Sequence, residues 1–185
     1  MRVISQSSKR GANAVVIECM ALDPELQWAS EHRIVKSTIG VITNVRQDHT
    51  ERIGPLLEDM AQALKMTIPV RGKLVTSESG FIPFFRREVK KLRTELVFAD
   101  PSRVKGSLMS KFPYLNFKEN VAIALEVCKL LGVDGLVGYR NRFLRGCFSG
   151  PPVCYSGSGA GYQGVGSTRV EFRGNHSAVC SGKIA

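Results

Sequence analysis

The sequence predicts an α/β protein with a mostly parallel sheet flanked by helices. Short apolar runs rich in β-branched residues alternate with segments of helical periodicity from the start of the chain to about residue 146. The intervals between the runs are long enough to hold helices, which is the pattern of parallel strands joined by crossover helices. At 185 residues with 43% apolar content, the chain can bury a core of ordinary domain size.

Each expected element depends on a local signal. Gly11 ends a first helix, Asp23-Pro24 gives a second its N-cap and first-turn proline, and Gly54-Pro55 opens a third. The last helix has apolar residues at helical spacing and Gly132 as its stop. In chain order the expected elements are helix 2–10, strand 14–18, helix 24–32, strand 38–43, helix 54–65, strand 73–76, helix 83–93, strand 95–99 and helix 117–131.

Composition argues against several classes of protein. No stretch approaches the roughly 20 apolar residues of a membrane-spanning helix. The first residues lack the apolar block of a signal peptide, so a cytoplasmic chain is expected. The five cysteines form no CxxC pair, and neither a zinc site nor a disulfide framework is indicated.

The formal net charge of +10 suits a polyanionic partner, such as nucleic acid, nucleotide phosphate, an acidic lipid surface or an acidic polymer. The densest basic cluster, within residues 86–93, falls on a predicted helix, where a solvated helix face is the simpler interpretation. No aromatic-and-glycine motif of an RNA-binding sheet is present. We therefore do not expect nucleic acid as the partner.

Residues 147–185 differ in kind from the rest of the chain. They hold eight glycines, six serines and three of the five cysteines, with no periodic apolar face. Such a stretch buries too little apolar surface to offset its ordering entropy. We expect a partial α/β domain over 1–146, followed by a tail over 147–185 that is either disordered or non-native sequence, for instance from a shifted reading frame.

Polar residues gather where two predicted strands end. One strand closes on Glu18, and the next, 38–43, is followed by Asn44, Asp48 and His49. Open parallel sheets bind ligands beyond the carboxyl ends of their strands, so Glu18 and His49 are expected on neighbouring strands at one crevice. A carboxylate and an imidazole there could hold Mg²⁺, Mn²⁺ or Zn²⁺. The alternative is a loop histidine that caps backbone groups.

Three stretches resemble one known family. TNVRQDH, at 43–49, followed by Glu51 and Gly54-Pro55, looks like the Asn-Val-x-x-Asp-His loop of the Mur ligase superfamily. Together with VIECMALDPELQW and FPYLNFKENVAIALEVCKLLGVD, it resembles a capsule-type branch of that superfamily, the ligase subunit of poly-γ-glutamate synthase. The likeness covers about residues 3 to 135, in order.

The resemblance implies an incomplete Mur-ligase central domain and amide ligation driven by ATP. In that family a chain-terminal carboxylate is phosphorylated, the amine of glutamate attacks the acyl phosphate, and Mg²⁺ bridges the phosphates. It further implies that Glu18 and His49 bind Mg²⁺, and that Asn44 and Asp48 shape the cofactor loop. Asn120 matches an asparagine near the nucleotide base. The equally open alternative is a helix N-terminal residue that bonds local backbone groups.

The chain departs from the family pattern in three places. It contains no G-x-x-x-x-G-K-[ST] phosphate loop. Lys65 follows the Asp-His loop, but its segment does not match that of the family's carbamylated lysine, and no role is assigned to it. The family's C-terminal portion is replaced by the tail. We therefore expect a fragment of a ligase that lacks the N-terminal phosphate loop and is inactive alone.

The partners that the resemblance implies are glutamate, the poly-γ-glutamate chain and other subunits of a membrane-associated capsule synthase. Those subunits would hold the chain at the inner face of the membrane, on its cytoplasmic side. Two other functions stay open. One is a non-catalytic remnant that associates with capsule-synthesis partners. The other, suggested only by charge, is a basic nucleic-acid-binding domain whose affinity falls steeply with salt.

Overall fold

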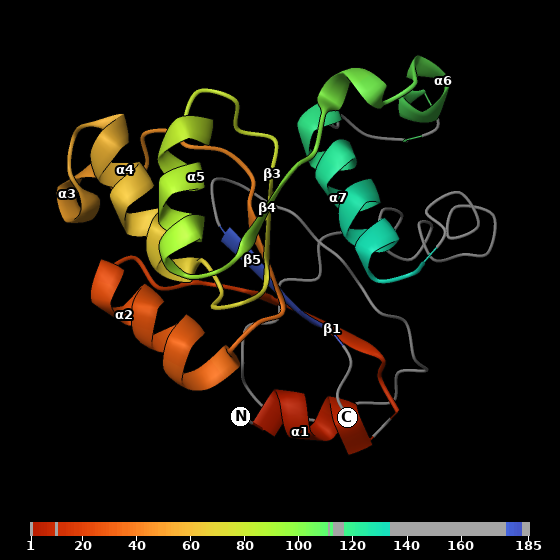
Figure 1. Cartoon of the computed structure of the whole chain (residues 1–185), viewed down its shortest axis with the longest axis horizontal. Coiled ribbons are helices and arrows are strands. Elements are labelled where there is room, and N and C mark those ends of the chain that lie inside the picture. Colours follow the sequence, from red (N-terminus) through yellow and green to blue (C-terminus); the bar gives the residue numbers. More distant parts are fainter. Residues whose placement is uncertain (1, 10, 111, 113–116, 134–176, 183–185) are drawn as a thin grey trace.

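The part of the chain that the structure describes forms a five-stranded sheet with helices on both faces (Figure 1). The structure, a computed structural model, describes residues 2–9, 11–110, 112, 117–133 and 177–182. The strands, in their order across the sheet, are β1 (Ala14–Glu18), β5 (Ser177–Gly182), β2 (Ile39–Ile42), β3 (Lys73–Thr76) and β4 (Glu95–Phe98). β2, β3 and β4 are parallel, whereas β5 pairs antiparallel with both β1 and β2.

Helical segments connect the strands. The α-helices are α1 (Arg2–Lys9), α2 (Pro24–Ala29), α3 (Thr50–Ile53), α4 (Leu57–Leu64), α5 (Ile82–Lys91), α6 (Gly106–Met109) and α7 (Lys118–Leu130). A π-helix, η1 (Ser30–Val35), continues α2, and two 3₁₀ turns, η2 (Lys65–Thr67) and η3 (Pro101–Arg103), follow α4 and β4. Prolines stand in the first turns of α2 and α5, where a missing N–H is tolerated.

β2 is buried on both faces, which explains its continuous apolar sequence. Val41 and Ile42 are adjacent in sequence, point to opposite faces and are 1% and 0% exposed. Gly40 lies so close to Pro69 that a β-carbon added at residue 40 would come within 2.6 Å of Pro69 Cδ. A larger residue at position 40 would therefore separate the strand from the segment that precedes β3.

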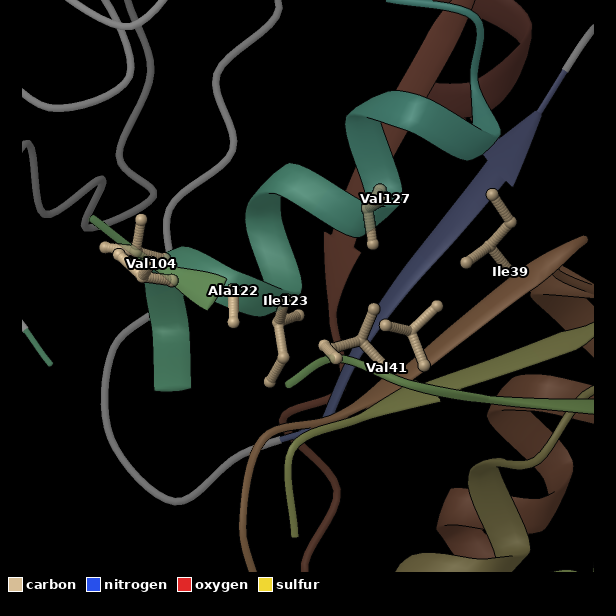
Figure 2. Packing of buried hydrophobic residues seen from close by; sticks show 9 residues of the cluster. Ile39, Val41, Val104, Ala122, Ile123 and Val127 are labelled. Carbon is tan, nitrogen blue, oxygen red and sulfur yellow. The ribbon is translucent and has the colours of Figure 1, made fainter. Parts of the chain in front are cut away.

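Two apolar cores sandwich the sheet. α7 covers one face, and Figure 2 shows Ala122, Ile123 and Val127 directed from that helix toward Ile39 and Val41 of β2. The core on the other face is formed by α4, α5 and side chains of β2 and β3, with Ile42, Leu74, Ile68 and Phe85 almost wholly buried. In Figure 1, α4 and α5 accordingly lie across the sheet from α7.

The predicted α/β fold with flanking helices is confirmed, and the expected strand 73–76 coincides with β3. Asp23 was expected to cap the second helix, but its side chain makes no cap hydrogen bond and instead binds Arg52. That helix also continues through η1, beyond its expected end at residue 32. A likeness to the Mur-ligase central domain stays a prediction.

The expectation of a tail without regular structure fails for residues 177–182, which form β5. This segment has a single β-branched residue, Val179, but each edge of its backbone pairs with a strand, and such pairing does not require an apolar stripe. The rest of the tail, 147–176 and 183–185, lies outside the described residues. Within the described ranges, no helix is both long and apolar enough to cross a membrane.

Candidate functional site

Polar residues follow β2, β3 and β4 at matching positions. Ile42, Thr76 and Phe98 are register partners in the parallel ladders. Asn44, Glu78 and Asp100 are each two residues beyond these partners, so all three lie at the carboxyl edge of the sheet. This edge is where open α/β sheets bind ligands. Asn44 was predicted from the sequence, whereas Glu78 and Asp100 were not, although the same signal, a polar residue just beyond an apolar strand, marks all three.

Glu78 links the loops at this edge. Its Oε2 accepts a hydrogen bond from the backbone N–H of Val45 at 3.0 Å, and its Oε1 accepts one from Gly80 N–H at 2.9 Å. Its own N–H donates to Thr76 Oγ1 at 3.1 Å. The loop after β2 is therefore held against the loop after β3 through one partly buried carboxylate.

Asn44 offers an acceptor to a ligand. Its Oδ1 is buried and receives no hydrogen bond from the described part of the chain. Leaving a buried acceptor unsatisfied costs about 1–3 kcal/mol, so this oxygen would gain from a hydrogen bond donated by a ligand or by water. An amide oxygen is also one of the oxygen ligands that Mg²⁺ and Ca²⁺ accept.

His49 lies between two carboxylates. Its Nε2 is 3.6 Å from Asp48 Oδ1, and its Nδ1 is 3.7 Å from Glu51 Oε1. The backbone of His49 is left-handed, with φ of 48°, and this residue is the N-cap of α3. The imidazole makes no cap hydrogen bond to α3, and the interpretation of His49 as a loop histidine that caps backbone groups stays open.

An ion pair anchors this loop to the rest of the fold. Arg52 of α3 donates to both oxygens of Asp23, at 2.9 and 2.7 Å from Nη2. The hydrogen bonds and the charge of Asp23 raise the pKa of the Arg52 guanidinium. The bidentate geometry fixes α3 relative to the start of α2, and thereby orients the turn that carries Asp48 and His49.

The structure separates the strands that were expected to be neighbours. Glu18 pairs with Ala178 of β5, and Ala178 pairs in turn with Val41 of β2. The prediction that β1 and β2 are adjacent is therefore wrong, because a strand from far along the chain inserts between them. Two interstrand spacings place the Glu18 backbone about 10 Å from Val41. Glu18 is nevertheless at the carboxyl edge and exposed.

Magnesium binding by Glu18 and His49 stays a prediction. Among the described residues, no group of three or more His, Cys, Asp or Glu side chains is placed to hold a metal. Mg²⁺ needs only one or two protein carboxylates when phosphates and water complete its shell. The separate oxygen groups of Glu18 and Asn44 fit that requirement better than they fit a closed, all-protein metal cage.

Asn120 is the third residue of α7 and is partly buried. The first turns of α7 pack near η3, which follows β4, whereas Val127 and Leu130 lie near the beginnings of the strands. Asn120 is thus placed toward the carboxyl edge. Both interpretations of this residue, a nucleotide contact and a local helix-end contact, stay open.

Comparison with known proteins gives two relatives. PGA synthase CapB of Bacillus subtilis (strain 168) is 36% identical over 150 residues, which are 81% of this chain and 37% of that protein. Capsule biosynthesis protein CapB of Bacillus anthracis is 35% identical over 140 residues, 76% of this chain and 30% of that protein. Over that part of their length, the CapB proteins are similar to this chain.

The chain thus spans only 30–37% of the length of the two CapB relatives. No protein-family model and no solved structure matches the chain.

Proposed function

We propose that this chain is the part of a poly-γ-glutamate synthase that contributes the carboxyl-edge site, and that the assembled enzyme is an ATP-dependent ligase. The product would be a γ-glutamyl amide bond, formed between a chain-terminal carboxylate and the amine of glutamate. The 36% identity to a protein named PGA synthase is the observation that carries this proposal. The buried, unsatisfied Oδ1 of Asn44 supports it.

Each candidate residue has a defined role in this proposal. Glu18 and His49 hold Mg²⁺, and Asn44 presents an oxygen acceptor beside them. Asp48 Oδ1 accepts a hydrogen bond from the backbone N–H of His49 at 2.9 Å and so stabilises the turn. When bound, Mg²⁺-ATP supplies the activation of the acceptor carboxylate. Asn120 is placed where it could contact the nucleotide.

The partners follow from the same proposal. Glutamate and the growing poly-γ-glutamate chain are the substrates, and further subunits of a capsule synthase hold this chain at the inner face of the membrane. The positive net charge of +10 favours retention of an anionic product.

The proposal is tested with a chimera of the B. subtilis relative. The 150 matched residues of that protein are replaced by the matching residues of this chain, and secreted polymer is measured as glutamate released by acid hydrolysis. We expect polymer from the chimera and from an Arg86→Ala control, which changes an exposed residue of α5. We expect none from His49→Ala.

Two outcomes would contradict the proposal. One is full polymer synthesis by the His49→Ala chimera. The other is a soluble chimera, present at the level of the natural protein, that makes no polymer. The second outcome favours the non-catalytic remnant over the ligase.

A further inference from the structure

A groove of about 1360 Å³ lies at the amino edge of the sheet, opposite the candidate site. Its wall includes the starts of β1, β2 and β3 and the last turn of α7. Pockets for small molecules typically enclose roughly 300–1,000 Å³. The groove therefore has room for an extended ligand rather than for a single amino acid.

Three cations line this groove without a matching carboxylate. Lys36, Arg71 and Arg93 are all exposed, and within the described part of the chain no ion pair involves any of them. Lys73 also lines the groove, but it is paired with Glu95. The groove thus presents three cations that form no ion pair with a described carboxylate.

The same three residues hold unusual backbone conformations. Lys36, Arg71 and Arg93 have φ of 52°, 55° and 55°, in the left-handed region that glycine or asparagine normally occupies. Each lies in the loop just before β2, β3 or β4. A long cation retained at a strained position, in three successive loops, points to a function for its charge.

The end of α5 shows most clearly that an arginine stands where a glycine would fit. Thr94 N–H bonds to Val89 O at 2.9 Å and Arg93 N–H to Lys90 O at 3.3 Å, which is the Schellman pattern. α7 ends in the same pattern with Gly132 at the left-handed position, with φ of 71°. The fold therefore accommodates glycine at this kind of position, yet Arg93 occupies the one that borders the groove.

The cations form a row along the edge. Lys73 of β3 and Glu95 of β4 are register partners. Arg71 lies two residues before Lys73, and Arg93 lies two residues before Glu95. Their backbones are thus about one interstrand spacing, roughly 5 Å, apart. Arg71 N–H also donates to Leu92 O at 3.0 Å. Lys36 and Arg71 also share the wall of a second cavity of about 270 Å³.

A buried carboxylate fixes the Lys36 end of the row. Glu31 is 2% exposed, and its Oε1 accepts hydrogen bonds from the N–H and Oγ of Ser37, at 2.8 and 2.9 Å. Lys36 N–H donates to Glu31 O at 2.7 Å. The backbone of this turn is therefore held at Lys36 and Ser37.

The floor of the groove is apolar and aliphatic. It includes Val16, Ile39, Val127, Leu130 and Leu131. Among the residues that the structure describes, the lining contains no Phe, Tyr or Trp. Proteins that bind single-stranded nucleic acid usually stack bases on aromatic side chains, so the lining favours a polyanion with a flexible aliphatic backbone over nucleic acid.

We propose that this amino-edge groove binds the poly-γ-glutamate chain, away from the site where it is extended. This inference rests on the proposed function. Each γ-linked residue keeps an α-carboxylate that is ionised at neutral pH. It adds five backbone bonds, which extend to roughly 6 Å, close to the spacing of the cation row. Its methylene groups can lie on the aliphatic floor while the carboxylates meet Lys36, Arg71 and Arg93.

The test is a titration of the purified chain with a fluorescently labelled γ-linked glutamate oligomer, followed by anisotropy at low and high salt. The variant R71Q/R93Q removes two charges of the row. Its matched control, R86Q/R87Q, removes two arginines from α5, which does not line the groove. We expect a loss of about tenfold in affinity for R71Q/R93Q and little change for the control. The variant R71K/R93K should retain binding, because it keeps the charge.

Unlabelled glutamate and single-stranded DNA are the competitors. We expect the monomer to compete weakly, since it meets only part of the row, and the DNA to compete less well than the glutamate oligomer. The inference is overturned if the oligomer does not bind, if both double variants lose affinity equally, or if DNA competes as well as the oligomer. None of these results depends on catalysis, so a failure here is distinct from a failure of the chimera to make polymer.

Discussion

The backbone N–H of Val45 donates a 3.0 Å hydrogen bond to Oε2 of Glu78, and this bond joins the loop after β2 to the loop after β3. Val45 is 6% exposed, so its N–H has little access to water if the carboxylate is removed. The neighbouring residue is Asn44, whose Oδ1 is the unsatisfied acceptor of the candidate site. Glu78 therefore positions the candidate site without belonging to the residues that the family resemblance identified.

Glu78→Ala should destabilise the fold by about 1–3 kcal/mol, because it leaves the buried Val45 N–H without its charged acceptor. Glu78→Gln keeps one acceptor oxygen and should cost less. Urea unfolding measures both free energies. Glu58→Ala, at an exposed position of α4, is the control. A Glu78→Ala protein as stable as this control would show that the Val45 bond contributes nothing.

The helices α5 and α7 both end in a Schellman pattern, with Arg93 and Gly132 at the left-handed position. Exchanging these two residue types tests the backbone strain at Arg93. Arg93→Gly should raise the free energy of unfolding by up to about 1 kcal/mol, because relief of the left-handed conformation exceeds the added entropy of the unfolded chain. The same change should weaken binding of poly-γ-glutamate. A more stable protein that binds the polymer less well is the result expected of a residue kept for function.

Gly132→Arg is the reciprocal change. No atom of the described residues lies within 4 Å of a β-carbon built at Gly132, so the substitution meets no clash there. Its cost of about 1–2 kcal/mol is that of the backbone conformation. Thermal unfolding of the two variants gives the comparison. If Arg93→Gly lowers the melting temperature, the strain argument is wrong and Arg93 contributes contacts that outweigh it.

The parallel part of the sheet was predictable because its strands are buried. Residues 73–76 read as a short apolar run and become β3, whose last three residues are fully buried. β5 was not predictable in the same way, since its sequence, SAVCSG, contains one β-branched residue. Its place in the sheet depends on backbone pairing with segments more than 130 residues earlier in the chain. No local pattern encodes such a partner.

The candidate site shows the same division. Asn44, Asp48 and His49 lie close together because they share one loop, and the sequence was sufficient to group them. Grouping Glu18 with them required the order of the strands, and β5 changes that order. The cation row at the other edge was missed because Lys36, Arg71 and Arg93 lie far apart in the sequence, and only the sheet brings their loops into line.

Burial raises the pKa of the Glu31 carboxyl above its ordinary value of 4.5, and the hydrogen bonds from Ser37 offset only part of this. The folded state therefore holds this proton more tightly than the unfolded state. Between pH 4.5 and the folded pKa the native protein binds more protons, so the free energy of unfolding falls as pH rises through that window. As pH rises through the folded pKa, the carboxyl ionises inside the protein and burial of its charge penalises stability.

Glu31→Gln removes that penalty and keeps an oxygen that can accept from Ser37. Relative to the natural protein, the variant should be more stable at about pH 7 than at about pH 5, as measured by urea unfolding. Glu25→Gln, at an exposed position of α2, should show no such difference. If the free energies of unfolding of Glu31→Gln and the natural protein differ by the same amount at both pH values, the pKa of Glu31 is not raised by folding.

The cation site is testable without nucleotide, using Mn²⁺ as a paramagnetic probe in place of Mg²⁺. If Glu18 and His49 are ligands, Glu18→Gln and His49→Ala should each weaken Mn²⁺ binding by about tenfold or more. Glu51→Gln, which changes a carboxylate 3.7 Å from His49 but not a proposed ligand, is the matched control. An unchanged affinity in Glu18→Gln would remove that residue from the site and leave the loop after β2 as the candidate ligand group.

β5 should be required for the position of β1. It pairs with β1 from Ala14 to Glu18 on one edge and with β2 from Ile39 to Ile42 on the other, and no other strand of the described chain pairs with β1. Val179→Pro removes the backbone N–H of residue 179, and with it one hydrogen bond of the ladder. Proline is therefore unfavourable in a central strand such as β5. We expect fast amide exchange at Val15 to Ile17 in this variant, while β3 and β4 stay protected by their own ladder.

Ser181→Ala keeps the backbone intact and serves as the control. Unchanged protection of β1 in Val179→Pro would show that β5 does not hold β1 in the sheet.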